Sequence, residues 1–77
     1  MKGENTMIEA GKKYIITEKI KDKTRMFSAR INYVEDRGEY LYIGYTPDDF
    51  IHGRFGAFRY YKDGQERPVM HYIQKAN

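Results

Sequence analysis

The chain has 77 residues, of which 40% are hydrophobic, and a net charge of +3. A chain this short forms one domain, which buries only about 60% of the surface that its unfolded state exposes. Because it contains no cysteine, disulfide bonds and cysteine-ligated zinc are excluded. Eight Tyr and four Phe must supply much of the core, so the abundance of aromatic residues does not by itself indicate a binding function.

The N-terminal stretch MKGENTMIEAGKK contains no apolar run of the kind found in a signal peptide. No segment approaches the roughly 20 apolar residues of a membrane-spanning helix. We therefore expect a cytoplasmic protein that makes no membrane contact. Residues 1–11 are expected to form a flexible lead, with Met7 as a second candidate start, and residues 12–77 a single small β-barrel domain.

Three strand patterns follow, at residues 12–20, 25–35 and 39–45. A polar turn and a three-residue loop ending in Gly38, where a positive φ is needed, would join them into an antiparallel meander. These turns pair Tyr14 with Ile31, and Ile31 with Ile43. The inner face would then comprise Tyr14, Ile16, Phe27, Ile31, Tyr33, Leu41, Ile43 and Tyr45.

The next stretch, TPDDFIHG, predicts one or two turns of helix. Thr46 suits an N-cap, Pro47 the first helical position and Gly53 the end of the helix. Asp48 and Asp49 would lie at the positive end of the helix dipole.

Asp63 and Gly64 are a strong signal for a two-residue type I′ hairpin turn. Strands on either side would then pair with each other, with Phe58 opposite Val69 on the core face. Four side chains would share the opposite face: Phe55, Arg59, Tyr61 and Tyr72.

The element order β-β-β-α-β-β predicts an all-β fold with one short helical turn. It is typical of a small five-stranded antiparallel barrel of the OB type. An SH3-like barrel, which has the same number of strands, is the alternative.

No feature of the sequence indicates an enzyme, a metal site or a cofactor. His52 and His71 are the only histidines, and neither lies at a metal-ligand spacing from another ligand. Helix capping explains the acidic pair at 48–49 better than acid–base catalysis does. We therefore expect a non-enzymatic binding domain.

The third strand carries the most informative outer face. If Leu41 and Ile43 point inward, Tyr40 and Tyr42 point outward, with Arg30 nearby on the preceding strand. Two tyrosines beside an arginine form a surface on which single-stranded bases stack. Tyrosine is also simply favoured in strands, and that structural explanation stays open.

The stretch RFGAF, residues 54–58, resembles the ribonucleoprotein motif of RNA-recognition and cold-shock domains. In that motif basic, glycine and aromatic residues alternate, and the resemblance implies rings that stack on bases. It covers five residues, lacks a glycine directly after the basic residue, and falls in the fourth expected strand rather than the second.

Two functions remain open. The first is binding of single-stranded DNA or RNA through an aromatic and basic sheet face. The alternative is a protein-binding inhibitor or adaptor of bacterial or phage origin, or a homodimer contact, because Tyr, Phe, Met and Arg are also enriched in interface cores. On either hypothesis the candidate contact residues are Arg30, Tyr40, Tyr42, Phe55, Arg59, Tyr61 and Tyr72.

Overall fold

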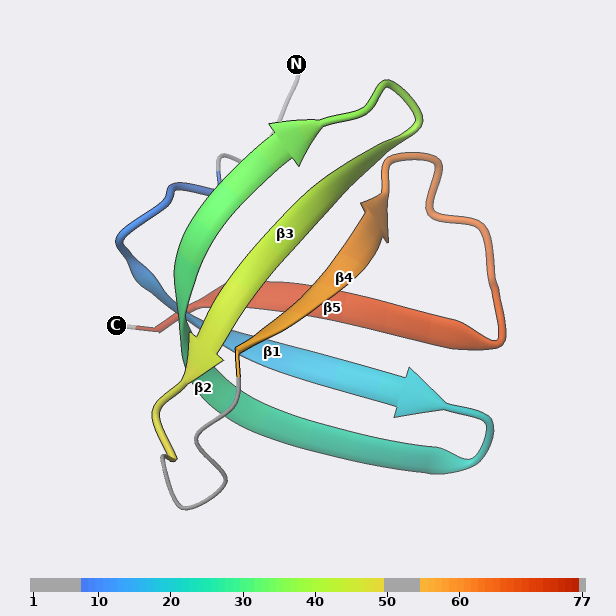
Figure 1. The fold of residues 1–77 in the computed structure, drawn as a ribbon. Helices are drawn as coiled ribbons and strands as arrows, with labels where there is room; N and C mark the ends of the chain where they lie inside the picture. Colours follow the sequence, from blue (N-terminus) through green and yellow to red (C-terminus); the bar gives the residue numbers. More distant parts are fainter. Residues whose placement is uncertain (1–7, 50–54, 77) are drawn as a thin grey trace.

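The computed structural model of the chain describes residues 8–49 and 55–76. These form five strands: β1 (Lys13–Ile20), β2 (Lys23–Asp36), β3 (Tyr40–Pro47), β4 (Gly56–Tyr61) and β5 (Val69–Lys75). All neighbouring strands are antiparallel and belong to one open sheet with the order β4-β3-β2-β1-β5 (Figure 1). The prediction of an all-β fold with five antiparallel strands is confirmed.

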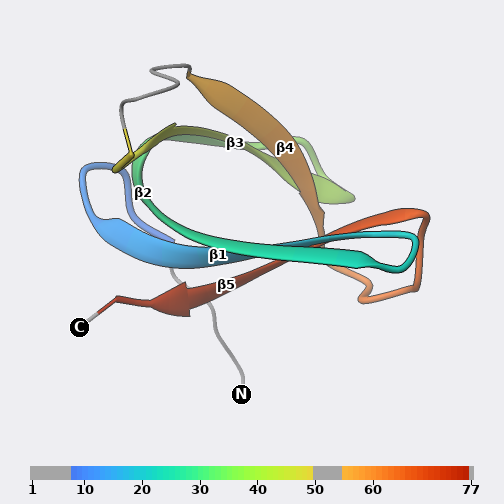
Figure 2. The ribbon, with the colours of Figure 1, turned by 90° about the horizontal axis from the view of Figure 1, so that it is seen from below.

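The sheet is curved because β2, with 14 residues, is shared between its two halves. The first part of β2 pairs with β1, and the last part pairs with β3. Figure 2 shows β2 bending between the two halves, so that β3 and β4 lie over β1 and β5. The core lies between the halves, and its buried members are Tyr14, Ile16, Ala29, Ile31, Ile43 and Phe58.

The pairing of β1 with β2 differs from the predicted register by two residues. Tyr14 lies opposite Ala29 rather than Ile31. A shift of two keeps each side chain on its face, because side chains alternate along a strand with a period of two. The prediction that Tyr14, Ile16 and Ile31 face the core is therefore confirmed.

A β-bulge at Asn32 changes the second part of β2. The register with β3 shifts between Ile31 and Tyr33, which leaves Asn32 as an extra residue, and its amide donates a hydrogen bond to the Thr46 hydroxyl (2.8 Å). A bulge exchanges the two faces of the strand beyond it. The prediction that Tyr33 faces the core is therefore wrong: its side chain is 42% exposed, and Val34 packs against the core instead.

The predicted helix does not begin at Thr46. Thr46 and Pro47 are the last residues of β3, where they lie opposite Arg30 and Ala29 of β2. The long neighbouring strand extends the ladder this far, and the β3–β4 ladder ends at Tyr45, so Pro47 lies beyond it, where the missing N–H breaks no bond to β4. The rest of the predicted helix, residues 50–53, lies outside the described residues. The described part of the chain holds no helix, and hence none that could cross a membrane.

The predicted hairpin between the last two strands is wrong. β4 pairs with β3 at one edge of the sheet, whereas β5 pairs with β1 at the other. Gly64 does adopt a positive φ of 71°, but Asp63 does not, and a type I′ turn requires it at both positions. Side chains connect the two strands instead: the rings of Phe58 and His71 stack with centroids 4.1 Å apart.

The segment just before β1 also contacts the sheet. Ile8 packs against the core, and the backbone N–H of Gly11 donates a hydrogen bond to the carbonyl of Ile31 (2.6 Å). The N–H of Glu9 donates to the hydroxyl of Tyr14 (2.8 Å). These contacts place residues 8–11 against the domain.

Gly56 leaves room for the ring of Tyr45, its partner on β3. That ring packs between Phe27 and Phe58, with centroid distances of 5.4 and 5.7 Å, so it has little freedom to move away. A Cβ at position 56 would overlap the ring. We expect Gly56→Ala to lower the free energy of unfolding by about 1–3 kcal/mol, measured by chemical denaturation.

Gly44→Ala is the matched control. A Cβ at Gly44 would overlap the ring of Tyr33, but that side chain is exposed and can rotate away. The loss of stability should therefore be smaller than at Gly56. Equal losses would show that crowding under the Tyr45 ring is not what requires glycine at position 56.

Candidate functional site

The outer face of β2, β3 and β4 carries a continuous group of tyrosines and arginines. Alternation along β3 places Tyr40 and Tyr42 on the side opposite to Ile43, as the sequence predicts. Arg59 and Tyr61 of β4 lie beside them, opposite Tyr42 and Tyr40 respectively. We refer to the whole group as the Tyr/Arg face: Tyr33, Arg37, Tyr40, Tyr42, Arg59, Tyr61 and Arg67.

Ring contacts connect the tyrosines across the three strands. The rings of Tyr40 and Tyr61 have centroids 5.3 Å apart, and those of Tyr33 and Tyr42 are 6.1 Å apart. Both pairs are tilted, with interplanar angles of 53° and 38°, and lie within the distance range of favourable aromatic pairs. The rings thus form two neighbouring pairs on one surface.

Each arginine of the face lies against one of these rings. The guanidinium carbon lies 3.7 Å from the ring centroid in the Arg67–Tyr61 pair and 5.0 Å in the Arg59–Tyr40 pair. Arg37 lies 5.8 Å from the Tyr42 centroid. All are within the range of cation–π attraction, which restrains the arginines on the face.

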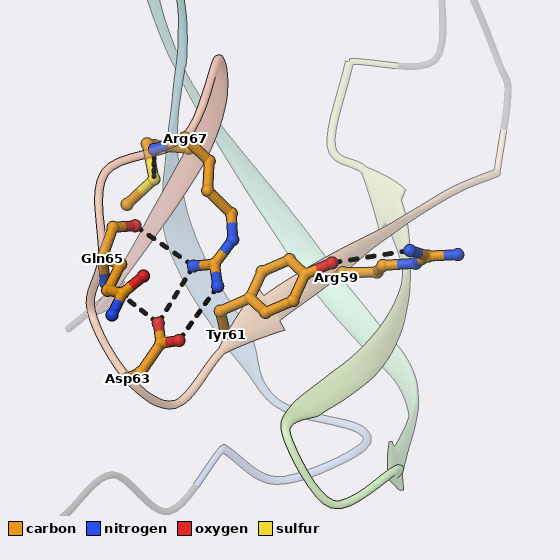
Figure 3. A network of polar contacts seen from close by, with 6 residues as sticks. Arg59, Tyr61, Asp63, Gln65 and Arg67 are labelled. Atoms are coloured by element: carbon orange, nitrogen blue, oxygen red, sulfur yellow. Dashed lines mark hydrogen bonds and ion pairs between the residues drawn. The ribbon is translucent and has the colours of Figure 1, made fainter.

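Two of the arginines also have a carboxylate partner. Arg67 donates two hydrogen bonds to the carboxylate of Asp63, both 2.9 Å (Figure 3). Arg37 donates to Glu35 at 2.8 Å. These two guanidinium charges are largely neutralised within the protein.

Asp63 remains ionised over most of the pH range. The hydrogen bonds from Arg67, followed by the one from the N–H of Gln65, lower the pKa of Asp63 to about 2. A carboxyl whose pKa is lowered on folding contributes stability above its unfolded value, 3.8, and loses that contribution as the pH falls toward 2. The Asp63–Arg67 pair therefore holds the loop after β4 in place at neutral pH.

Arg59 is the exception among the three arginines. In the described ranges of the chain, its hydrogen-bond partner is the hydroxyl of Tyr61, at 3.4 Å, and it forms no ion pair (Figure 3). That hydrogen bond is the largest cause of the raised pKa of Arg59, followed by the charges of Tyr40 and Tyr61 on ionisation. The exposed guanidinium between these tyrosines thus carries a charge that no carboxylate of residues 8–49 or 55–76 offsets.

Phe55 extends this surface beyond the tyrosines. It lies directly before β4 and is 78% exposed. Together with Asn32, Tyr33 and Ala57 it lines an open hollow of about 510 Å³. Of the two rings in the RFGAF stretch, Phe55 is therefore exposed, whereas Phe58 is buried.

The structure does not bring the other two predicted contact residues to this group. Arg30 lies opposite Thr46, four residues along β3 from Tyr42. Tyr72 lies on β5 opposite Thr17, in the other half of the sheet, with 48% of its surface exposed. Their expected positions followed from registers that the sheet does not adopt.

Three members of the face were not predicted from the sequence. Tyr33 is turned outward by the bulge at Asn32, and Arg67 reaches Tyr61 from the loop that precedes β5. Arg37 lies in the β2–β3 loop, whose position the sequence predicts correctly, since Gly38 adopts the expected positive φ of 90°. Its place beside the face could therefore have been predicted. Nothing local in the sequence marks the other two.

The histidine in the described residues has a structural environment. His71 stacks on Phe58, its side chain is only 8% exposed, and its Nε2 lies 3.2 Å from a carboxylate oxygen of Glu18. Glu18 also forms an ion pair with Arg25 (3.2 Å). The described part of the chain contains no group of three or more residues able to hold a metal ion.

Comparison of the chain with models of protein families, with curated proteins and with solved structures gives no significant match. A function must therefore be inferred from the residues and geometry of the Tyr/Arg face.

Proposed function

We propose that the protein binds single-stranded nucleic acid on the Tyr/Arg face. The observation that carries this proposal is the position of Arg59 between Tyr40, Tyr42 and Tyr61, with no carboxylate partner among the described residues. Tyrosine rings offer stacking surfaces to bases, at about 1–3 kcal/mol per base. A guanidinium beside them can stack on a base or donate to a phosphate.

The arrangement of charges also supports this proposal. Arg37 and Arg67 are held by Glu35 and Asp63, so their guanidinium planes add flat stacking surface rather than net charge. Within the Tyr/Arg face itself, net attraction to phosphate would then rest mainly on Arg59. We propose a binding protein of moderate affinity without enzymatic activity, since the carboxylates of the face already serve to hold arginines.

We further propose that the curved sheet belongs to an SH3-like rather than an OB-like barrel. An OB-fold pairs its first strand with its fourth, whereas here β1 pairs with β5 and β3 with β4. The stacking of Phe58 on His71 would close the seam between β4 and β5 by side chains. In such a barrel the Tyr/Arg face lies on the outside of the β2–β3–β4 half.

The proposal is tested by titrating labelled single-stranded DNA and RNA at two salt concentrations, with wild type and Arg59→Gln. We expect the wild type to bind more weakly at the higher salt, because counterions are released from each neutralised phosphate. Arg59→Gln should weaken binding roughly tenfold, the loss expected for one charge-assisted contact.

Arg30→Gln is the matched control, because it removes the same charge from the same outer side of the sheet but away from Tyr40 and Tyr42. It should change affinity much less. Absence of any salt-sensitive binding by wild type at micromolar concentration would refute the proposal. Equal losses in the two variants would mean that net charge, rather than this face, determines binding.

Phe55 favours a second candidate function, in which the same side of the sheet binds a protein. A phenylalanine with 78% exposure next to Tyr33 is typical of an interface anchor. On this alternative, Phe55→Ser would abolish capture of a protein partner, or a dimer of this chain, while the fold stays intact. If nucleic acid is the ligand, Phe55→Ser should instead cost no more than one stacking contact.

A further inference from the structure

An open basic pocket lies next to the Tyr/Arg face, beyond Arg67. It has a volume of about 590 Å³, and three of its lining residues are cationic: Lys19, Lys21 and Arg67. Glu66 is the carboxylate that lines it, and Tyr72 contributes an aromatic wall. The pocket brings together the end of β1, the following turn, the loop before β5 and β5 itself.

The two lysines give this pocket its net positive charge. Neither Lys19 nor Lys21 forms an ion pair within the described residues, in contrast to Lys12, Lys13 and Lys62. Since Arg67 is already held by Asp63, two uncompensated ammonium groups face the single carboxylate of the lining. A lysine pair of this kind attracts a phosphate as a point charge.

The backbone holds Lys21 beside the pocket. Lys21 occupies the β1–β2 turn with a φ of 55°, which is uncommon for a residue other than glycine. Its N–H donates a hydrogen bond to the carbonyl of Pro68 (3.4 Å), so the turn is attached to the loop that forms the other wall. The position of Lys19 is fixed by strand pairing, since it lies on β1 directly opposite Met70 of β5.

Arg67 joins the pocket to the Tyr/Arg face. Its guanidinium lies 3.7 Å from the ring centroid of Tyr61, and the same side chain lines the pocket. A ligand that extends along the rings of Tyr40 and Tyr61 would therefore reach the two lysines next. On that basis we infer that the pocket is a phosphate subsite, which takes a backbone phosphate of a strand bound on the Tyr/Arg face.

This inference rests on the proposed function, and it adds the path that the bound strand follows across the surface. Bases would stack on the tyrosines of β3 and β4, and the backbone would continue past Arg67 toward Lys19 and Lys21. A strand too short to reach beyond Tyr61 would not use the pocket. Longer oligonucleotides should therefore bind more tightly than short ones, and this difference should require Lys19 and Lys21.

The test compares Lys19→Gln/Lys21→Gln with Lys12→Gln/Lys75→Gln. The control removes the same charge from the other end of β1 and β5, where Lys12 and Lys75 line a different open pocket. Each variant and the wild type are titrated with single-stranded oligonucleotides of about 4 and about 12 nucleotides, within the range of site sizes for small β-barrel domains. Affinity is measured over a series of salt concentrations.

The pocket variant should bind the longer oligonucleotide about tenfold or more weakly than wild type and the control. The slope of log affinity against log salt should fall by roughly 0.7 for each phosphate contact that is lost. Binding of the shorter oligonucleotide should be unchanged. If wild type binds the longer strand but both double variants retain the same affinity and slope, the subsite is refuted while the proposed function stands.

A second measurement separates the subsite from the proposed function. Pyrophosphate is titrated into the wild type and the pocket variant, and backbone amide shifts are followed by NMR. Shifts at residues 19–21 and 66–68 that the variant lacks support a phosphate subsite, even if no oligonucleotide binds and the proposed function fails. Absence of oligonucleotide binding together with absence of these shifts overturns both.

Discussion

Replacing Ile43 with alanine should lower the free energy of unfolding by about 2–5 kcal/mol. Ile43 is completely buried, and its neighbours across the ladders are Val34 of β2 and Phe58 of β4. The truncation would leave a cavity where the two halves of the curved sheet meet. Because domains of this size have little stability in reserve, a substantial fraction of the variant should be unfolded at room temperature.

Circular dichroism and tyrosine fluorescence during chemical denaturation measure this loss, since the chain has no tryptophan. Val69→Ala is the control, because Val69 lies at the edge of the same sheet and is 46% exposed. Its loss should stay within about 0.5 kcal/mol. Similar losses for both variants would show that the buried position of Ile43 does not dominate the stability of the core.

The double substitution Tyr40→Ala/Tyr42→Ala should abolish most of the binding to single-stranded nucleic acid. At about 1–3 kcal/mol for each ring, the loss of two stacking rings should weaken the free energy of binding by about 2–6 kcal/mol. Both side chains are only half-buried, on the outer side of the sheet, so the fold should survive with a modest loss from the Tyr40–Tyr61 contact. Binding titration and thermal melting of the same variant separate the two effects.

Tyr72→Ala is the matched control, since it removes a half-exposed tyrosine from the other half of the sheet. It should leave the affinity of a short oligonucleotide unchanged. If Tyr40→Ala/Tyr42→Ala unfolds, Tyr40→Leu/Tyr42→Leu keeps apolar contact area while removing both aromatic rings. Full binding by a folded variant without these rings would exclude stacking on β3.

Local alternation of side chains is what made several features predictable. Tyr14, Ile16, Ile31 and Ile43 were assigned to the core from period-two patterns, and all are buried. The two-residue register error between β1 and β2 did no harm, because it preserved the faces. The outward direction of Tyr40 and Tyr42 followed from the same alternation within a single strand.

The bulge at Asn32 could not be anticipated in this way. Two apolar residues, Tyr33 and Val34, follow Asn32 in succession, so the pattern allows either of them to face the core, and a regular strand explained Tyr33 as well as a bulged one did. The tertiary fold decides, because β2 must bend to serve both halves of the sheet, and a bulge bends a strand. Tyr33 joins the Tyr/Arg face as a consequence of that bend.

Strand pairing over long distances was likewise decided by tertiary structure. The chain itself specifies five strands, an inner face and a glycine at Gly38 that takes a positive φ. It does not specify that β5 pairs with β1 instead of β4, because the turn signal at Gly64 favours a hairpin between β4 and β5. Burying Ile16 and Ile73 against each other across β1 and β5 outweighs that local preference, and it places Arg67 over the ring of Tyr61.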